Sequence, residues 1–556
     1  MRQRLIALHE SQWGPWWISG LAGLLLIAVA AFSGLIQNYF SGEEFLVYHY
    51  ASNFAHTEAL QQFFFQNGRL IEALYWTYEY EVLGYQPLLF HAISFVLLLI
   101  LALLATACFL NVWPRKGRSQ ALPYLFIFLL FLNWIVLSNV LRLSYDNGRL
   151  SMIFFFAAGL ALQRWAASQR GRWLLLSYAL FLVCVMTYEN AVFLFPALVL
   201  LAWPLLPAEK RANWRQRVLI FGSLSALSGL ILLMPYWLYG FILQSGLGSV
   251  ATPARNFAIG EFFAQLSRYG PAVYVGFGQV VNFGQGPWNM LVAIGLLAVI
   301  LIASLWIVRL HRSPQPEMDP DTKLRWTSIF MAALWFLFFG PLPYILAGFG
   351  AGARVYSSAI FGVFLLLMLN YERTEPVVRR LALVLIVLFA TVGLFVLSQE
   401  STRVIEGEAA EVFFYSGLKD VVPHVRADTV FFIIDGPIGN SGCGPSLEML
   451  YLQRDLNCAI LSSVYDKYMA VRRDLVIETS GQELTDENVI LILVEGDRVR
   501  LLDQIAPGDD FGIYIDWESA EPIRTNTDKI VSQDLPAPSS FYLHLLERAA
   551  VLLPRR

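Results

Sequence analysis

Charged residues are scarce in this chain: they make up 15% of its 556 residues, whereas hydrophobic residues make up 57%. The formal net charge at pH 7 is −3, so the sequence gives no indication of a nucleic-acid partner. Walker, zincin, Gly-rich dinucleotide and Ser-His-Asp elbow motifs are all missing, which leaves soluble nucleotide chemistry without support. No internal repeat is visible. With a mean hydropathy of +0.55, the chain is not an ordinary soluble globular protein.

Cysteine is rare as well, with four residues in the whole chain. Cys108 and Cys184 fall in hydrophobic runs, where a thiol serves as a small apolar side chain. Cys443 and Cys458 lie on either side of a helix predicted in the C-terminal part. Outside the cytoplasm such a pair can form a disulfide, and two free thiols are the alternative.

Long hydrophobic runs, by contrast, are abundant, and a helix of about 20 apolar residues crosses the core of a bilayer. We predict a polytopic α-helical membrane protein of about eleven spans, within a range of ten to thirteen. The spans are 16–36, 87–110, 121–141, 151–165, 174–187, 191–206, 217–243, 290–308, 326–348, 355–371 and 381–398. Alternatively, 174–206 is one bent element, and 271–283 is a re-entrant or interfacial candidate. Arg2 and Arg4 precede the first span without a cleavage site, as in an uncleaved signal anchor.

The basic residues predict the orientation, because Lys and Arg collect in short loops on the cytoplasmic side. They are frequent in every second connecting segment, beginning with the amino end, and sparse in the segments between, provided that 174–206 crosses twice. We therefore expect a multi-pass protein of the cell (inner or plasma) membrane with its amino end in the cytoplasm. The segment after the first span and everything after the last span are expected outside.

Ionisable side chains recur in the segments assigned to the outside. Glu43 and Glu44 open the first of these, before an amphipathic stretch, 51–66, that is expected to lie in the membrane interface. A carboxylate near basic groups can act as a general base on a hydroxyl, and an arginine can clamp a phosphate. The alternatives are arginines that snorkel to the headgroups and, for Glu189, a turn at the outer boundary. The further candidates are His49, Arg69, Arg142, Asp146, Arg149, Glu189 and Arg354.

With these residues in these places, the chain resembles the GT-C superfamily of glycosyltransferases over about residues 1–400. The similar branch contains the protein O-mannosyltransferases and the lipid A aminoarabinose transferases. Glu43-Glu44 stands where members carry an acidic doublet, usually Asp-Asp or Asp-Glu. Asn67-Gly68-Arg69-Leu70 resembles a Gly-Arg-Pro-like element of the first outer loop. Asp146 matches a carboxylate of the second outer loop, and Thr187-Tyr188-Glu189-Asn190 resembles a short acid-bearing link.

The resemblance implies a transferase that moves a sugar, with inversion, from a polyprenyl-phosphate donor to a hydroxyl outside the cytoplasm. The acceptor would be a glycan, a lipid or a protein, and Glu43 or Glu44 would be the base. The other candidate roles are acceptor or metal positioning by Asp146, Glu189 and His49, and donor phosphate binding by Arg149, Arg142, Arg354 and Arg69. The need for a divalent metal stays open, because the metal-binding pattern of some members is not clearly matched. A transporter or flippase and a non-catalytic scaffold are the alternatives.

The composition changes near residue 399, where charged residues become frequent and long apolar runs end. We assign 1–398 to a transmembrane catalytic domain and 399–556 to a soluble extracytoplasmic α/β domain. Strands are predicted at 429–435 and 489–494, and helices near 445–454 and 464–475, in a partly parallel arrangement. Asp435-Gly436-Pro437 and Cys443-Gly444-Pro445 are expected as loops, either at a ligand site or as simple turns.

Overall fold

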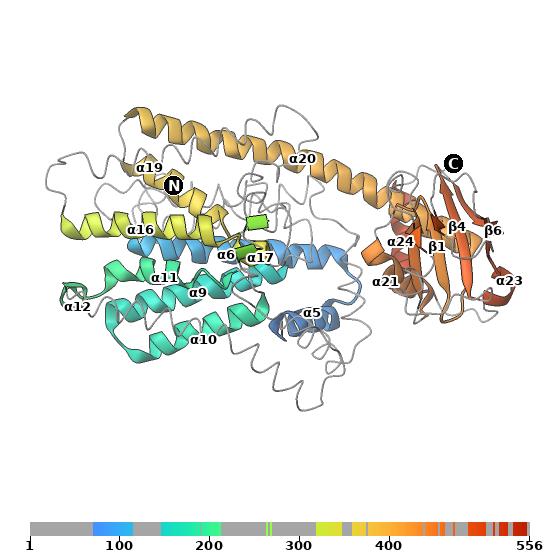
Figure 1. Ribbon diagram of the computed structural model, residues 1–556, viewed down its shortest axis with the longest axis horizontal. Coiled ribbons are helices and arrows are strands. Elements are labelled where there is room, and N and C mark those ends of the chain that lie inside the picture. Colours follow the sequence, from blue (N-terminus) through green and yellow to red (C-terminus); the bar gives the residue numbers. More distant parts are fainter. Residues whose placement is uncertain are drawn as a thin grey trace, which may run out of the picture. The chain divides into compact units, whose positions relative to one another are not determined.

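The computed structural model in Figure 1 divides the chain into two compact units. The first unit contains the described residues of 70–75 and 90–400, and the second contains those of 76–89 and 401–552. The residues that the structure describes are 70–114, 146–188, 191–212, 263–264, 267–268, 319–346, 358–373, 376–437, 440–453, 456–461, 471–472, 488–496, 498–506, 515–516, 522–531 and 538–552. The predicted spans 16–36, 121–141, 217–243 and 290–308, the interfacial stretch 51–66 and the segment 271–283 lie outside them.

The first unit is helical, and its helices coincide with the seven predicted spans that fall on described residues. Its longer elements are α6 (Pro87–Val112), α9 (Asp146–Ser168), α10 (Gly171–Thr187), α11 (Phe195–Ala202), α16 (Pro320–Phe339) and α19 (Ile360–Arg373). Shorter elements are η4 (Trp203–Leu205), α12 (Ala208–Ala212) and α17 (Leu342–Leu346). Three helical stretches, Pro87–Val112, Asp146–Ser168 and Pro320–Ile345, are long and apolar enough to cross a membrane. This supports the membrane class predicted from the sequence.

The stretch 174–206 forms two helices and not one bent element. Helix α10 ends at Thr187, and a short turn that includes Ala191–Leu194 leads into α11. After η4 the chain returns to the end where α10 began, because Lys210 Nζ donates a hydrogen bond to Gln169 Oε1. Segments rich in basic residues alternate with sparse ones along the chain only if 174–206 contains two separate elements, as it does here.

Aromatic rings and a few buried polar bonds hold the helices of the first unit together. Phe156 lies edge-on to Phe109 and Phe361, with ring centroids 5.5 and 4.9 Å apart. Gln163 Nε2 donates to the backbone oxygen of Cys108 at 2.8 Å, which satisfies a polar group deep among apolar side chains. Cys108 and Cys184 are both free and buried, as predicted for thiols that pack as small apolar groups.

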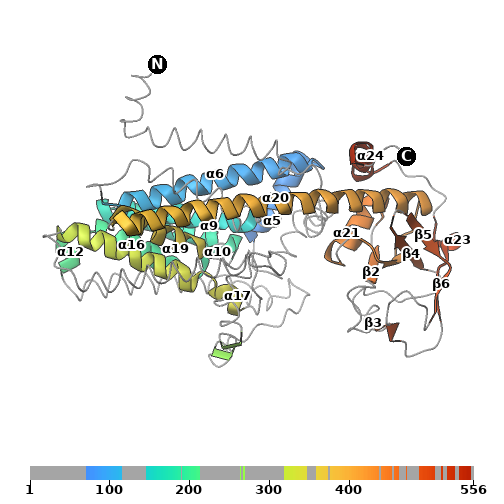
Figure 2. The ribbon, with the colours of Figure 1, turned by 90° about the horizontal axis from the view of Figure 1, so that it is seen from above.

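Helix α20 (Pro376–Val421) runs without a break through the predicted domain boundary at 398/399. Its 46 residues correspond to a length of about 70 Å at 1.5 Å per residue, more than twice the core of a bilayer. Figure 2 shows it as one continuous ribbon. After Pro376 the next proline is Pro423, two residues past its end. The change of composition near 399 therefore marks the end of the apolar part of a helix and not the end of the helix.

The second unit contains the partly parallel sheet that the sequence predicts. Its strands β1 (Val430–Ile434), β2 (Asn457–Leu461), β4 (Val489–Glu495) and β5 (Arg498–Leu502) lie in the order β2-β1-β4-β5. Strand β1 is parallel to β2 and β4, and β5 returns antiparallel to β4. Every residue of β1 is buried, because both faces of the central strand are covered. Smaller elements are β3 (Val471–Arg472), β6 (Gln504–Ile505), β7 (Ile515–Asp516), β8 (Ile523–Arg524) and α23 (Thr527–Ile530).

Two predictions for this unit are wrong in detail. Cys443-Gly444-Pro445 is not a loop, because it lies within α21 (Asn440–Tyr451). Pro445 is the sixth residue of α21 and has no backbone N–H, so the helix lacks one backbone hydrogen bond there. Residues 471–472 form strand β3, paired with β7, where a helix is predicted for 464–475. Asp435 does form a turn after β1, with φ of 55°.

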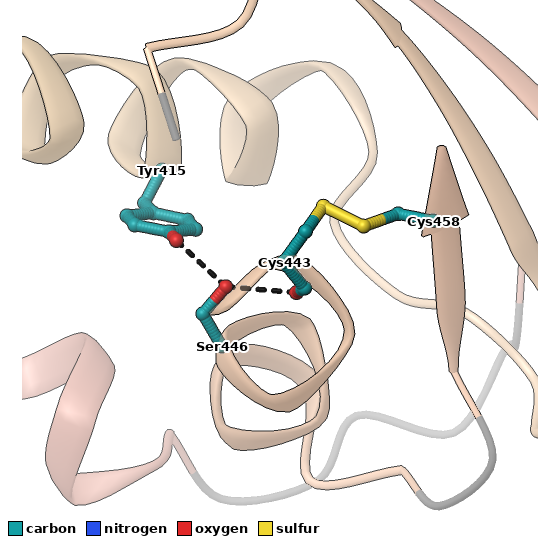
Figure 3. The surroundings of a disulfide bond; sticks show 4 residues. All are labelled: Tyr415, Cys443, Ser446 and Cys458. Carbon is teal, nitrogen blue, oxygen red and sulfur yellow. Dashed lines mark hydrogen bonds between the residues drawn. A yellow bond between two sulfur atoms is a disulfide. The ribbon is translucent and has the colours of Figure 1, made fainter. Parts of the chain in front are cut away.

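Cys443 and Cys458 are joined by a disulfide, which is the pairing expected from the sequence (Figure 3). It connects the first turn of α21 to β2, across a sequence separation of 15 residues. The same turn is fixed from the other side, because Tyr415 of α20 donates to Ser446 Oγ at 2.6 Å and Ser446 donates to Cys443 O at 2.8 Å. Helices α20 and α21 and strand β2 are thus bound together at one point.

Helix α5 (Leu70–Leu83) precedes α6 and is not predicted from the sequence. Its second half belongs to the second unit, as does α24 (Ser540–Leu552) near the end of the chain. The Tyr85 ring lies 5.5 Å from those of Phe541 and His544 on α24. The end of the first predicted outer segment therefore packs against the last helix of the chain.

Replacement of Gly362 by Ala should destabilise the first unit. A Cβ there would lie 2.4 Å from the backbone oxygen of Ala333 on α16, so α16 and α19 would have to move apart, at a cost of about 1–3 kcal/mol. The midpoint of thermal unfolding in detergent measures this. G407A is the matched control, because a Cβ on Gly407 of α20 meets nothing within 4 Å and Ala favours a helix. Equal effects of both substitutions would contradict the close approach.

Loss of the disulfide should destabilise the second unit. In the chain-entropy model, closing a loop of this length contributes about 3 kcal/mol. The C443A/C458A variant should therefore unfold at lower temperature or denaturant than the oxidised protein, read out by limited proteolysis within residues 430–500. Dithiothreitol should lower the stability of the native protein to that of the variant and leave the variant unchanged. A native protein insensitive to reduction would exclude a stabilising bond.

Candidate functional site

The two ends of the helical unit hold different side chains. At one end Arg211 pairs with Asp321 at 2.9 Å, and Arg325 donates to Val112 O at 3.3 Å. All of these belong to segments expected in the cytoplasm. At the other end Ser151 Oγ lies 3.0 Å from Tyr188 O, and the Tyr188 ring lies 6.5 Å from that of Tyr344. Tyr188, which is expected outside, therefore lies near Ser151 of α9 and Tyr344 of α17.

The candidate site lies at this second end and is built around Asp146, the first residue of α9. Asp146 is fully buried and forms an ion pair with Arg149, one helical turn further on. Ser94 of α6 donates its hydroxyl hydrogen to Asp146 Oδ2 at 2.6 Å. A buried carboxylate is costly without such partners, so the two bonds explain how the charge is accommodated.

A second carboxylate joins the site from α5. Asn147 Nδ2 donates to Glu72 Oε1 at 2.6 Å, and both side chains are buried. We call Glu72, Ser94, Asp146, Asn147 and Arg149 the Asp146 cluster. It holds two carboxyl groups and one guanidinium, and it lies at the amino end of α9, where the backbone N–H groups favour a negative charge.

The bonds within the Asp146 cluster limit what each group can do. The Asp146 carboxylate accepts from both Ser94 and Arg149, so it is held in one orientation and is suited to positioning or electrostatic stabilisation. Arg149 is almost completely buried and one of its amino groups is used by Asp146. A phosphate bound here would meet a guanidinium whose charge is already balanced by Asp146.

Of the site residues predicted from the sequence, Asp146 and Arg149 are brought together. Their roles in acceptor positioning and phosphate binding stay predictions. The other predicted site residues lie outside the described part of the chain: Glu43, Glu44, His49, Arg69, Arg142, Glu189 and Arg354.

A metal site is not formed by the described residues, which contain no group of three or more His, Cys, Asp or Glu side chains suited to hold an ion. Within the Asp146 cluster the two carboxylates are engaged by Ser94, Asn147 and Arg149. The described residues therefore supply no set of ligands for the divalent metal whose need the sequence leaves open.

Three members of the cluster are not predicted as site residues from the sequence: Glu72, Ser94 and Asn147. Ser94 lies inside an otherwise apolar span near its outer end, together with fully buried His91 one turn before it. Polar side chains at membrane depth are a signal for function or helix contact. Glu72 could have been found only by knowing that Leu70–Leu83 is a helix.

Neither a protein-family model nor a curated protein nor a solved structure matches this chain.

Replacement of Asp146 by Asn should strongly destabilise the helical unit. The change removes the Asp146 charge that pairs with the buried Arg149 guanidinium, and breaking a buried ion pair from one side costs about 3–5 kcal/mol. D321N is the matched control, because Asp321 forms an exposed pair with Arg211 that is worth at most about 1 kcal/mol. Thermal unfolding in detergent distinguishes the two. The double variant D146N/R149Q should recover part of the loss, and a D146N protein as stable as D321N would show that the buried pair is absent.

Proposed function

We propose that the chain is a membrane glycosyltransferase of the GT-C type. It transfers a sugar from a polyprenyl-phosphate donor to a hydroxyl on the outer side of the cell membrane. The observation that carries the proposal is the Asp146 cluster, in which acidic, basic and hydroxyl side chains from α5, α6 and α9 meet at one end of the helical unit. Buried ionisable groups at membrane depth are costly and favour a functional role over a purely structural one.

In the proposed mechanism Glu43 or Glu44 removes the proton from the acceptor hydroxyl, whose oxygen attacks the anomeric carbon of the donor sugar. The bond to the phosphate oxygen breaks, the configuration inverts and polyprenyl phosphate leaves. Asp146, held by Ser94 and Arg149, positions the acceptor together with Glu189 and His49. Arg69, Arg142 and Arg354 stabilise the charge on the departing phosphate, because guanidinium forks match phosphate oxygens.

The proposed topology has eleven spans, a cytoplasmic amino end and an extracytoplasmic α/β domain. Support comes from the disulfide, since such bonds persist mainly outside the cytoplasm. It also comes from the separation of the charge-rich segments at the two ends of the helical unit, with Arg211 and Arg325 at one end and the Asp146 cluster at the other.

The test is release of polyprenyl phosphate from a panel of lipid-linked sugars by purified protein in nanodiscs. We expect release with at least one donor, and a loss of about 10²–10⁴-fold in E43Q/E44Q, the range that general-base catalysis contributes. E81Q is the matched control, because Glu81 follows in the same predicted outer segment and is exposed on α5. It should turn over like the native protein.

Two outcomes would count against the proposal in different ways. Native turnover by E43Q/E44Q would exclude the doublet as the base. Donor binding without release by the native protein, for every donor in the panel, would favour a flippase or a non-catalytic scaffold.

A further inference from the structure

Exposed apolar side chains are unevenly distributed over the second unit. Among its described residues seven large apolar side chains are strongly exposed, and Leu452 stands apart from the rest in sequence. The other six lie on α24 and on the segment Trp76–Leu89: Tyr78, Val82, Leu88, Leu89, Leu543 and Leu546. Single exposed leucines are ordinary, but a concentration of them marks an interaction surface.

Helix α24 has buried apolar residues on one side, and on the other side it exposes two leucines next to Glu547. One side is packed within the unit, where Phe541 and Leu545 are buried and the Phe541 ring lies 5.5 Å from that of Tyr415. The other side exposes Leu543 and Leu546, one turn apart, at 49% and 45%. The helix therefore carries apolar surface beyond what its packing on the unit uses.

Polar contacts fix which side of α24 faces the unit. Arg548 Nε donates to Glu408 Oε1 of α20 at 2.6 Å. Lys419 Nζ lies 5.6 Å from the Tyr542 ring centroid and 4.4 Å from that of Tyr451, where both rings attract the ammonium. Burial lowers the pKa of Lys419 to about 8. With these contacts and the buried Phe541 in place, Leu543 and Leu546 are held on the free side.

Tyr85 connects α24 to the start of α6. Its ring lies 5.5 Å from those of Phe541 and His544, and it precedes by two residues the start of α6. Helix α6 is long and apolar enough to span a bilayer, and Leu88 and Leu89 in its first turn are exposed. The residues that lead into α6 therefore pack against α24 within the second unit.

We infer that α24 lies in the membrane–water interface, where Leu543 and Leu546 contact lipid beside the lipid-facing start of α6. A helix with one face on protein and exposed leucines on the other suits this interface, where its apolar side can enter the boundary of headgroups and acyl chains. Tyr78 and Val82 are also exposed, one turn apart, on α5. The inference requires that α6 crosses a membrane, and it is independent of any transferase activity.

The test is lipid-dependent quenching at single labelled positions of the full chain in nanodiscs. L543C and L546C each receive an environment-sensitive fluorophore; the native cysteines are either buried free thiols or paired in the disulfide. L452C is the matched control, because Leu452 is similarly exposed at 57% and follows α21. Labelled but unsubstituted protein gives the background.

We expect blue-shifted emission at 543 and 546, strong quenching by nitroxide-labelled lipids and weak quenching by iodide. Position 452 should show red-shifted emission and the reverse pattern of quenching. Two results would overturn the inference. Iodide quenching at 543 and 546 equal to that at 452 would place α24 in water. Protection from both quenchers would mean that protein, such as a second copy of the chain, covers this face.

Discussion

The buried pair of Asp146 and Arg149 is the interaction on which the arrangement of the helical unit depends. It occupies the first turn of α9, and through Ser94 it fixes α6 beside that turn. The neighbouring residue, Asn147, ties in α5 through Glu72. Three segments that lie up to 75 residues apart in sequence are thereby fixed together by groups that would be costly to bury separately.

Apolar packing alone would not choose this arrangement among similar ones. Leucine-rich helices slide past one another at little cost in lipid, because the tails are as apolar as the side chains. Polar bonds at both ends of α6 and α9 remove that freedom: Ser94 with Asp146 at one end, and Asn111 with Gln163, at 3.1 Å, at the other. The two helices therefore run parallel with a defined register. Hydrogen bonds at both ends of the pair position the Asp146 cluster at one end.

The sequence predicts the features that follow from hydrophobicity and misses those that depend on individual side-chain contacts. The described spans, the parallel strands β1 and β4 and the disulfide partners all follow from apolar runs, alternation and composition. Helix α5 is not predicted from hydrophobicity, because Leu70–Leu83 mixes aromatic, acidic and β-branched residues without a clear apolar face. In the site, Asp146 and Arg149 are visible as charges beside a span, whereas Ser94 and Asn147 matter only through contacts distant in sequence.

The domain boundary shows why composition and architecture differ. The apolar run ends near residue 399, but a helix ends only where its backbone bonds are interrupted, and in α20 that happens at Val421. The residues between are charged enough to be solvated and still favour a helix. Their last turns supply Tyr415 and Lys419, which hold α21 and α24. One helix therefore carries apolar surface suited to lipid in its first half and forms the scaffold of the α/β unit in its second.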